Sequence, residues 1–190
     1  LTTSSAASDV YKRQLENSST GTENTALGTE AMSSGDATGD LNTAVGFASG
    51  KNLTSGNKNV LLGAYSGDAL NGGISNVAVG YASLSTATSS NYNTAIGHEA
   101  LHLNNNSNRN VAVGFQALYT HSTTNATDTY NTAVGYQAGV AVTTGIKNTI
   151  IGGLAGDALT TGENNTALGY AALSTSADGD HNTCLLYTSP

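Results

Sequence analysis

The sequence has 190 residues, which is enough for one ordinary domain. Only 10% of the residues are charged, and six Lys and Arg residues against 13 Asp and Glu give a formal net charge of −7. This balance excludes a phosphate-neutralising surface, and no apolar run approaches the roughly 20 residues of a membrane-spanning helix. We therefore expect no nucleic-acid partner and no membrane insertion by this segment. One cysteine excludes an intrachain disulfide.

Three segments are expected along the chain. Residues 1–16 contain SSAASDVYKRQ, which resembles translated adaptor sequence at the edges of metagenomic assemblies, and are predicted to be a non-native leader. Residues 17–183 are predicted to form one repeat domain. Residues 184–190, CLLYTSP, are predicted to be a non-native tail, because Cys184 stands where the repeat calls for alanine. The natural protein is then expected to extend beyond both ends.

A five-residue unit, N-[TV]-x-[VIL]-G, recurs along the predicted domain. Its copies start at spacings of 18, 17, 17, 17, 17, 21, 17 and 17 residues, and a broken tenth copy follows at Asn182. A fixed period of this length indicates an array of stacked structural units. The Asn at position zero and the Gly at position 4 are assigned as structural repeat residues: Asn24, Asn42, Asn59, Asn76, Asn93, Asn110, Asn131, Asn148 and Asn165, with Gly28, Gly46, Gly63, Gly80, Gly97, Gly114, Gly135, Gly152 and Gly169.

Apolar positions are also repeated within each unit. Position 3 is always aliphatic, position 5 is often aromatic, and position 7 is Ala or Ser. Position 8 is either a large apolar residue or Gly. Where it is Gly, an aliphatic residue follows three positions later, at Leu53, Leu70, Val142 and Leu159. One hydrophobic slot is thus filled from two alternative positions, which predicts that every unit builds the same small core.

The period and the residue types predict an all-β fold, a β-solenoid of about ten 17-residue coils. Positions 1–3 are expected to form one strand, the Gly at position 4 a tight turn, and positions 5–8 a second strand. Stacked coils place the Asn side chains in a ladder about 4.8 Å apart. Position 2 faces away from positions 1 and 3, so one side of the strand lines the solenoid and the other is expected to pack against a neighbouring chain.

The repeat unit resembles the N-S-V-A-I-G head repeats of the trimeric autotransporter adhesins over about Asn24 to Thr183. The resemblance implies a left-handed parallel β-roll, three chains side by side, and display on a bacterial surface, anchored to the outer membrane through regions outside this segment. Thr25, Val60 and Val77 then take the first apolar slot, and Leu27, Leu62 and Val79 the second. Two departures are a longer period and no neck, stalk or anchor. Similar N-T-A-x-G-x-x-A-L arrays occur in proteins that look like phage tail fibres.

GHEALH, Gly97 to His102, contains the H-E-x-x-H pattern of zinc peptidases. Zinc binding by this pattern needs a helix, whereas on an extended segment the two imidazoles lie roughly 13 Å apart. In the repeat alignment His98 occupies the aromatic position. We therefore expect no metal, no cofactor and no catalytic residues, and His98 is predicted to be a half-buried stacking residue. The chain is predicted not to be an enzyme.

A four-residue insertion lies between Asn110 and Asn131, in the run YTHSTTNATDTY. Binding residues often lie on loops carried by a rigid scaffold. The ligand-binding candidates are Tyr119, His121, Asp128 and Tyr130, and the alternative is a tolerated insertion without a contact role.

The predicted function is a structural and adhesive segment of a homotrimeric surface fibre that binds an unknown host-surface or matrix ligand by avidity. The alternative is the shaft of a phage tail fibre used in host attachment, located on the virion tail. A function of another class is an ice-binding solenoid. It requires a flat Thr array, which Val60, Val77 and Val111 interrupt.

Overall fold

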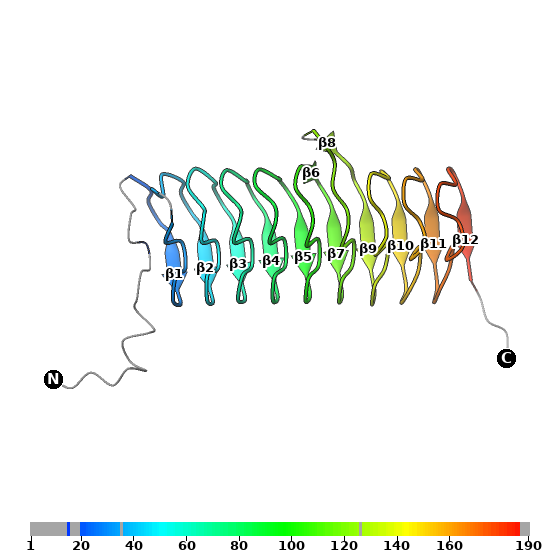
Figure 1. The fold of residues 1–190 in the computed structure, drawn as a ribbon, viewed down its shortest axis with the longest axis horizontal. Coiled ribbons are helices and arrows are strands. Elements are labelled where there is room, and N and C mark those ends of the chain that lie inside the picture. The colour runs from blue at the N-terminus through cyan, green and yellow to red at the C-terminus, as the bar shows by residue number, and fades with distance from the viewer. Residues whose placement is uncertain (1–14, 16–19, 35, 126, 187–190) are drawn as a thin grey trace, which may run out of the picture.

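The computed structural model describes residues 15, 20–34, 36–125 and 127–186, and in them the chain winds into a parallel β-solenoid drawn out along one axis (Figure 1). The described part contains strands and turns and no helix, so no helix there is long and apolar enough to cross a membrane. The strands are β1 Thr25–Leu27, β2 Thr43–Val45, β3 Val60–Leu62, β4 Val77–Val79, β5 Thr94–Ile96, β6 Ser107–Asn108, β7 Val111–Val113, β8 Thr127–Asp128, β9 Thr132–Val134, β10 Thr149–Ile151, β11 Thr166–Leu168 and β12 Thr183–Leu185.

Ten of these strands form one parallel sheet in the order β1-β2-β3-β4-β5-β7-β9-β10-β11-β12. Each strand pairs with the same repeat positions in the next coil, as in Val77↔Thr94. The predicted strand at positions 1–3 is therefore confirmed. In the last coil β12 includes Cys184 and Leu185, so the strand geometry continues two residues past the expected boundary at Thr183. The foreign origin of the two ends stays a prediction.

The Asn side chains at position zero form the predicted ladder inside the solenoid. Asn59 Oδ1 accepts hydrogen bonds from the backbone N and from Nδ2 of Asn76, both at 3.0 Å. Asn76 Oδ1 does the same for Asn93, at 3.0 and 3.3 Å. These side chains are almost completely buried, so each amide is satisfied by its neighbours in the column and not by water.

The Gly at position 4 is required by the close approach of successive coils. Gly80 has a φ of 133°, which side chains with a Cβ rarely adopt. A Cβ on this residue would also lie 2.5 Å from the carbonyl oxygen of Gly97 in the next coil. Conformation and space together therefore select Gly at this position.

The prediction of a second strand at positions 5–8 is wrong. Positions 6 and 8 have left-handed backbone, with φ of 50° at Ala82 and 54° at Leu84, and the segment forms consecutive turns. Coil-to-coil hydrogen bonds continue through it nevertheless, from Ala82 N to Ala64 O at 2.9 Å and from Leu84 N to Ala100 O at 3.0 Å. The stack is thus bonded on this side too, without the extended dihedral angles of a strand.

The core lies between the sheet and these turns, and position 2 points into it. Ala78, Ala95 and the other central residues at position 2 have no exposed surface. Position 2 is large in two coils, at Leu61 and Ile150, and both are buried. A Cβ on Gly67 at position 8 would lie 2.9 Å from Leu61 Cδ2. The predicted compensation between positions 8 and 11 is therefore part of a wider exchange of volume that includes position 2.

The opposite face of the ten-stranded sheet points outward. It consists of positions 1 and 3 of each strand, and we call it the outer sheet face. Along it run Thr or Val at position 1 and aliphatic side chains at position 3, and several of the aliphatic ones are at least one third exposed: Leu27, Val60, Ile96, Val111, Ile151, Leu168 and Leu185.

Candidate functional site

The insertion between Asn110 and Asn131 changes one coil of the array. Its strand β8 pairs in parallel with β6 of the preceding coil, through Ser107↔Thr127 and Asn108↔Asp128, to form a separate two-stranded sheet. In Figure 1 this sheet lies at the end of the coils opposite the lower turns, and β8 projects beyond the neighbouring loops. The insertion therefore extends the coil sideways and leaves the main sheet continuous.

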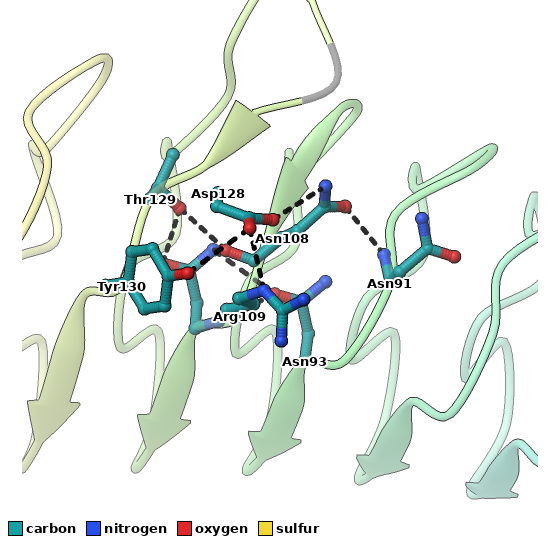
Figure 2. Close-up of polar contacts among 8 residues, drawn as sticks. Asn91, Asn93, Asn108, Arg109, Asp128, Thr129 and Tyr130 are labelled. Carbon is teal, nitrogen blue, oxygen red and sulfur yellow. Dashed lines mark hydrogen bonds and ion pairs between the residues drawn. The ribbon is translucent and has the colours of Figure 1, made fainter.

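Four exposed side chains gather beside this sheet, and we call them the Arg109 cluster: Tyr92, Arg109, Asp128 and Tyr130. Arg109 Nε donates to Asp128 Oδ2 at 2.8 Å, and the Tyr130 hydroxyl donates to the same oxygen at 3.3 Å, as Figure 2 shows. The Arg109 guanidinium carbon lies 4.6 Å from the centre of the Tyr92 ring and 5.9 Å from that of Tyr130.

The cluster is placed by a backbone feature that recurs in every intact coil. The residue directly before each ladder Asn, at position −1, has a left-handed backbone. In the cluster these residues are Tyr92, Arg109 and Tyr130, with φ of 59°, 61° and 52°. This conformation turns their side chains outward on successive coils, so that a cation lies between two aromatic rings. The sequence analysis missed Tyr92 and Arg109, although reading position −1 down the column would have found them.

Electrostatics in the cluster are locally balanced. The hydrogen bond from Arg109 lowers the pKa of Asp128, and the same bond raises the pKa of Arg109. Both side chains are 42% exposed, and the tyrosines are about half exposed. The cluster thus offers solvent a paired charge flanked by aromatic rings, a combination that suits protein or peptide contacts.

His121 lies elsewhere, in the core of the same coil. Its Nε2 is 3.3 Å from Nδ2 of Asn131 and 3.2 Å from the Thr129 hydroxyl. Because the Asn131 amide nitrogen is a donor, Nε2 is the acceptor of that bond. Burial lowers the pKa of His121 to about 4, against a smaller raising effect of the Thr143 backbone. His121 is therefore a neutral ladder element with no surface to offer a ligand.

Tyr119 lies in a third place, stacked on His102 with ring centres 5.1 Å apart and planes at 4°. Of the four predicted ligand-binding residues, the structure brings together Asp128 and Tyr130 and separates Tyr119 and His121 from them.

The two histidines of GHEALH point into different columns. His98 stacks between Tyr81 and Phe115, with ring centres 5.0 and 5.2 Å apart, in a column of exposed aromatic rings. The prediction of His98 as a half-buried stacking residue is confirmed, since its side chain is 47% exposed. No group of three His, Cys, Asp or Glu side chains that could hold a metal ion occurs among the residues that the structure describes.

His102 borders an open pocket of about 220 Å³ that spans three successive coils. We call it the Asp68 pocket, and its walls are Tyr65, Asp68, Tyr81, Ala82, Ser85 and His102. Sequence analysis missed it because its residues come from repeat positions 5, 6 and 9 of different coils. The residues at position 9 are Asp68, Ser85 and His102, and this position does not belong to the repeat pattern described above.

The Asp68 pocket contains Ser, His and Asp side chains, but their geometry is not that of a nucleophilic triad. His102 Nδ1 is 2.9 Å from the Ser85 hydroxyl and 3.1 Å from the carbonyl oxygen of Ala82. The carbonyl can only accept, so Nδ1 carries the proton and cannot take one from Ser85. Asp68 lies on the other side of Ser85 in the column and does not orient the imidazole.

The fold is that of a parallel β-solenoid repeat protein, and its surface carries the Arg109 cluster and the Asp68 pocket. No family model, no curated protein and no solved structure matches the chain.

Proposed function

We propose that the chain is a rigid rod segment of an adhesive surface fibre, which assembles as a homotrimer through the outer sheet face and performs no catalysis. One observation carries the proposal: a continuous ten-stranded sheet presents rows of aliphatic side chains to solvent on its outer side. Extended apolar surfaces of this kind are typical of interfaces with other protein chains.

The assembly that we propose follows the resemblance to autotransporter head repeats: a left-handed roll, three chains side by side, on a bacterial surface. Position 3 is aliphatic in all ten strands of the main sheet, and exposed Val60 and Val111 extend the apolar surface to position 1. Three chains that bury these rows against one another leave the loops and the Arg109 cluster facing outward. A stiff rod carrying identical outward surfaces increases binding by avidity.

Self-association is tested by light scattering on the full chain. We expect a solution mass about three times the chain mass of 19.1 kDa. The double variant Ile96→Lys/Ile151→Lys places two charges on the outer sheet face and is expected to give monomers. Leu103→Lys changes an exposed apolar residue outside the sheet and is the matched control. A monomeric wild-type chain at high micromolar concentration contradicts the trimer.

The adhesive role is tested with beads coated with the full chain. Attachment to animal cells or matrix proteins, reduced in the double variant, supports the surface adhesin. Attachment to bacterial cells alone favours the phage tail-fibre shaft. Thermal hysteresis without attachment to either supports the ice-binding alternative, which the position-1 threonines on the outer sheet face allow in part.

A further inference from the structure

We propose that the Asp68 pocket binds a primary alkylammonium group, such as a lysine side chain of a partner or the end of a polyamine. The inference goes beyond the proposed function, because this binding needs neither trimer formation nor adhesion. It is carried by the geometry of one carboxylate, two tyrosine rings and a hydroxyl around an open space.

The pocket lies where a small residue at position 6 has a larger residue on either side of it in the column. Position 6 is Tyr65 in the preceding coil and Glu99 in the following coil, but Ala82 between them. In the two coils after that of Glu99, Gln116 and Gln137 fill the same position and hydrogen-bond to each other at 2.8 Å. The missing side chain at Ala82 leaves space between the aromatic column and Asp68. The volume of this space is about 220 Å³.

The carboxylate of Asp68 lacks a full set of partners. Its Oδ1 is buried and has no hydrogen-bond partner within the part of the chain that the structure describes. Burial raises the pKa of Asp68, while the backbone N–H groups of Asp68 and Ala69 act in the opposite direction and more weakly. The nearby cation Lys51 is already bound to Glu30 at 2.7 Å. A partly buried carboxylate in this state is stabilised by a cationic donor.

The walls of the pocket suit the same ligand. Tyr65 and Tyr81 both line the pocket, and their rings lie edge to face, with centres 5.9 Å apart and planes at 78°. Tyrosine faces attract cations, and the alkyl part of an amine packs on the rings. The Ser85 hydroxyl, on which His102 donates, keeps an acceptor lone pair for one N–H of the ammonium. The net charge of −7 attracts cations to the chain in general.

The chain contains its own control site. Asp157 occupies position 9 in a coil with the same G-D-A-L sequence, and its Oδ1 is also buried without a partner in the described residues. Asp157 does not line the Asp68 pocket. Asp68→Asn and Asp157→Asn therefore remove the same charge from equivalent backbone positions. Position 6 of the same coil is Tyr65 for the first and Leu154 for the second.

Binding is measured by NMR titration of the full chain with Nα-acetyl-lysine methylamide at neutral pH. We expect saturable, millimolar binding that weakens at least tenfold in Asp68→Asn and is unchanged in Asp157→Asn. Ala82→Gln, which places in the gap the residue found at Gln116 and Gln137 in the same backbone conformation, is expected to abolish binding without loss of folding. Spermidine in a parallel titration distinguishes a free polyamine from a lysine side chain as the tighter ligand.

Several results overturn the proposal. Unchanged binding by Asp68→Asn, or an equal loss in Asp157→Asn, shows only general attraction to an acidic chain. Tetramethylammonium has no N–H donor. If it binds with equal affinity, hydrogen bonds from a primary ammonium are not required, and the proposal is contradicted. Binding of methyl glucoside in place of the amine assigns the pocket to a neutral polyol. None of these results affects the solution mass, so the failure of this inference and of the fibre proposal are distinguishable.

Discussion

The regular coils and the coil with the insertion build the same ladder from different side chains. Between Asn59 and Asn76, one carbonyl oxygen accepts both the backbone N–H and the side-chain amide of the next Asn. Between Asn110 and Asn131 the backbone bond is kept at 3.0 Å, but the Thr129 hydroxyl takes the second place on Asn110 Oδ1, at 2.8 Å. The Asn131 amide turns instead to His121.

This difference shows what the fold requires. In both kinds of coil the Oδ1 of one ladder Asn accepts the backbone N–H of the next, whereas the second donor can be an amide or a hydroxyl. The insertion is accommodated because it brings its own hydroxyl and imidazole into the column. In the regular coils the ladder consists of amides, which do not titrate. In the modified coil it also includes the imidazole of His121, which does.

The largest effect is expected from Asn76→Ala in a regular coil. The substitution removes four side-chain hydrogen bonds, and with them the partners of the Asn93 backbone N–H and of the Ser90 carbonyl. Asn59 Oδ1 keeps the bond from the backbone N–H of residue 76. We expect a loss of about 3–5 kcal/mol in the free energy of unfolding, measured by urea denaturation. Asn105→Ala, at an exposed position that accepts one hydrogen bond from Thr88, is the control and is expected to change little.

A somewhat smaller effect is expected from acidification, and it is confined to the modified coil. His121 has a pKa of about 4 in the folded chain against about 6.5 when unfolded. Between these values the unfolded chain binds the proton and the folded chain does not, so stability falls as pH drops from 6.5 to 4. The difference corresponds to about 3 kcal/mol.

The measurement is urea denaturation between pH 7.5 and 4.5, in wild type and in His121→Gln. The glutamine variant keeps a polar side chain in the column but has no proton to bind, so its stability is expected to change much less over this range. Equal pH dependence in both proteins assigns the effect to the carboxylates elsewhere in the chain.

The exchange of core volume gives the next prediction. Gly67→Ala places a methyl group 2.9 Å from Leu61 Cδ2 and imposes a Cβ on a φ of 56°. We expect a loss of about 1–3 kcal/mol. Leu61→Ala alone leaves a cavity and costs about 2–5 kcal/mol. In the double variant the two losses should be less than additive by at least about 1 kcal/mol, which a double-mutant cycle measures.

The smallest effect on global stability is expected from Arg109→Ala in the Arg109 cluster. The residue is exposed, and solvent screens its ion pair with Asp128. Hydrogen exchange of residues 127–130 should nevertheless become faster, because the variant frees Asp128 and one face of Tyr130. Lys147→Ala, at the same repeat position in another coil, leaves exchange there unchanged. Unaltered exchange in Arg109→Ala shows that the pairing of β6 and β8 alone holds this segment.

Much of the fold could be predicted because each repeat position has one physical task. Asn59 and its equivalents form a hydrogen-bonded column, and Gly80 and its equivalents lie where a Cβ has no room. The second strand was predicted wrongly, since an apolar residue such as Leu84 gives no sign in the sequence of its left-handed backbone. In a turn that is stacked on its copies, coil-to-coil hydrogen bonds and burial outweigh the local preference for extended backbone.

The candidate sites were harder to predict because they form across coils. Asp128 and Tyr130 were found through the break in spacing, but Tyr92 and Arg109 look like ordinary variation until position −1 is read from coil to coil. The pocket around Asp68 has no contiguous motif, and it depends on the small size of Ala82 between larger neighbours. In such an array, the residues of a site come from equivalent positions in successive coils and are not contiguous in the sequence.

The in-register pairing of successive strands makes the length of the molecule adjustable in steps. Because β3 pairs with β4 and β4 with β5 at the same repeat positions, removal of residues 76–92 lets β5 take the place of β4 beside β3. Each duplication or loss of seventeen codons therefore changes the length of the solenoid by one coil, while the register between neighbouring strands stays the same. Unequal recombination between the copies can lengthen or shorten such a spacer without redesigning it.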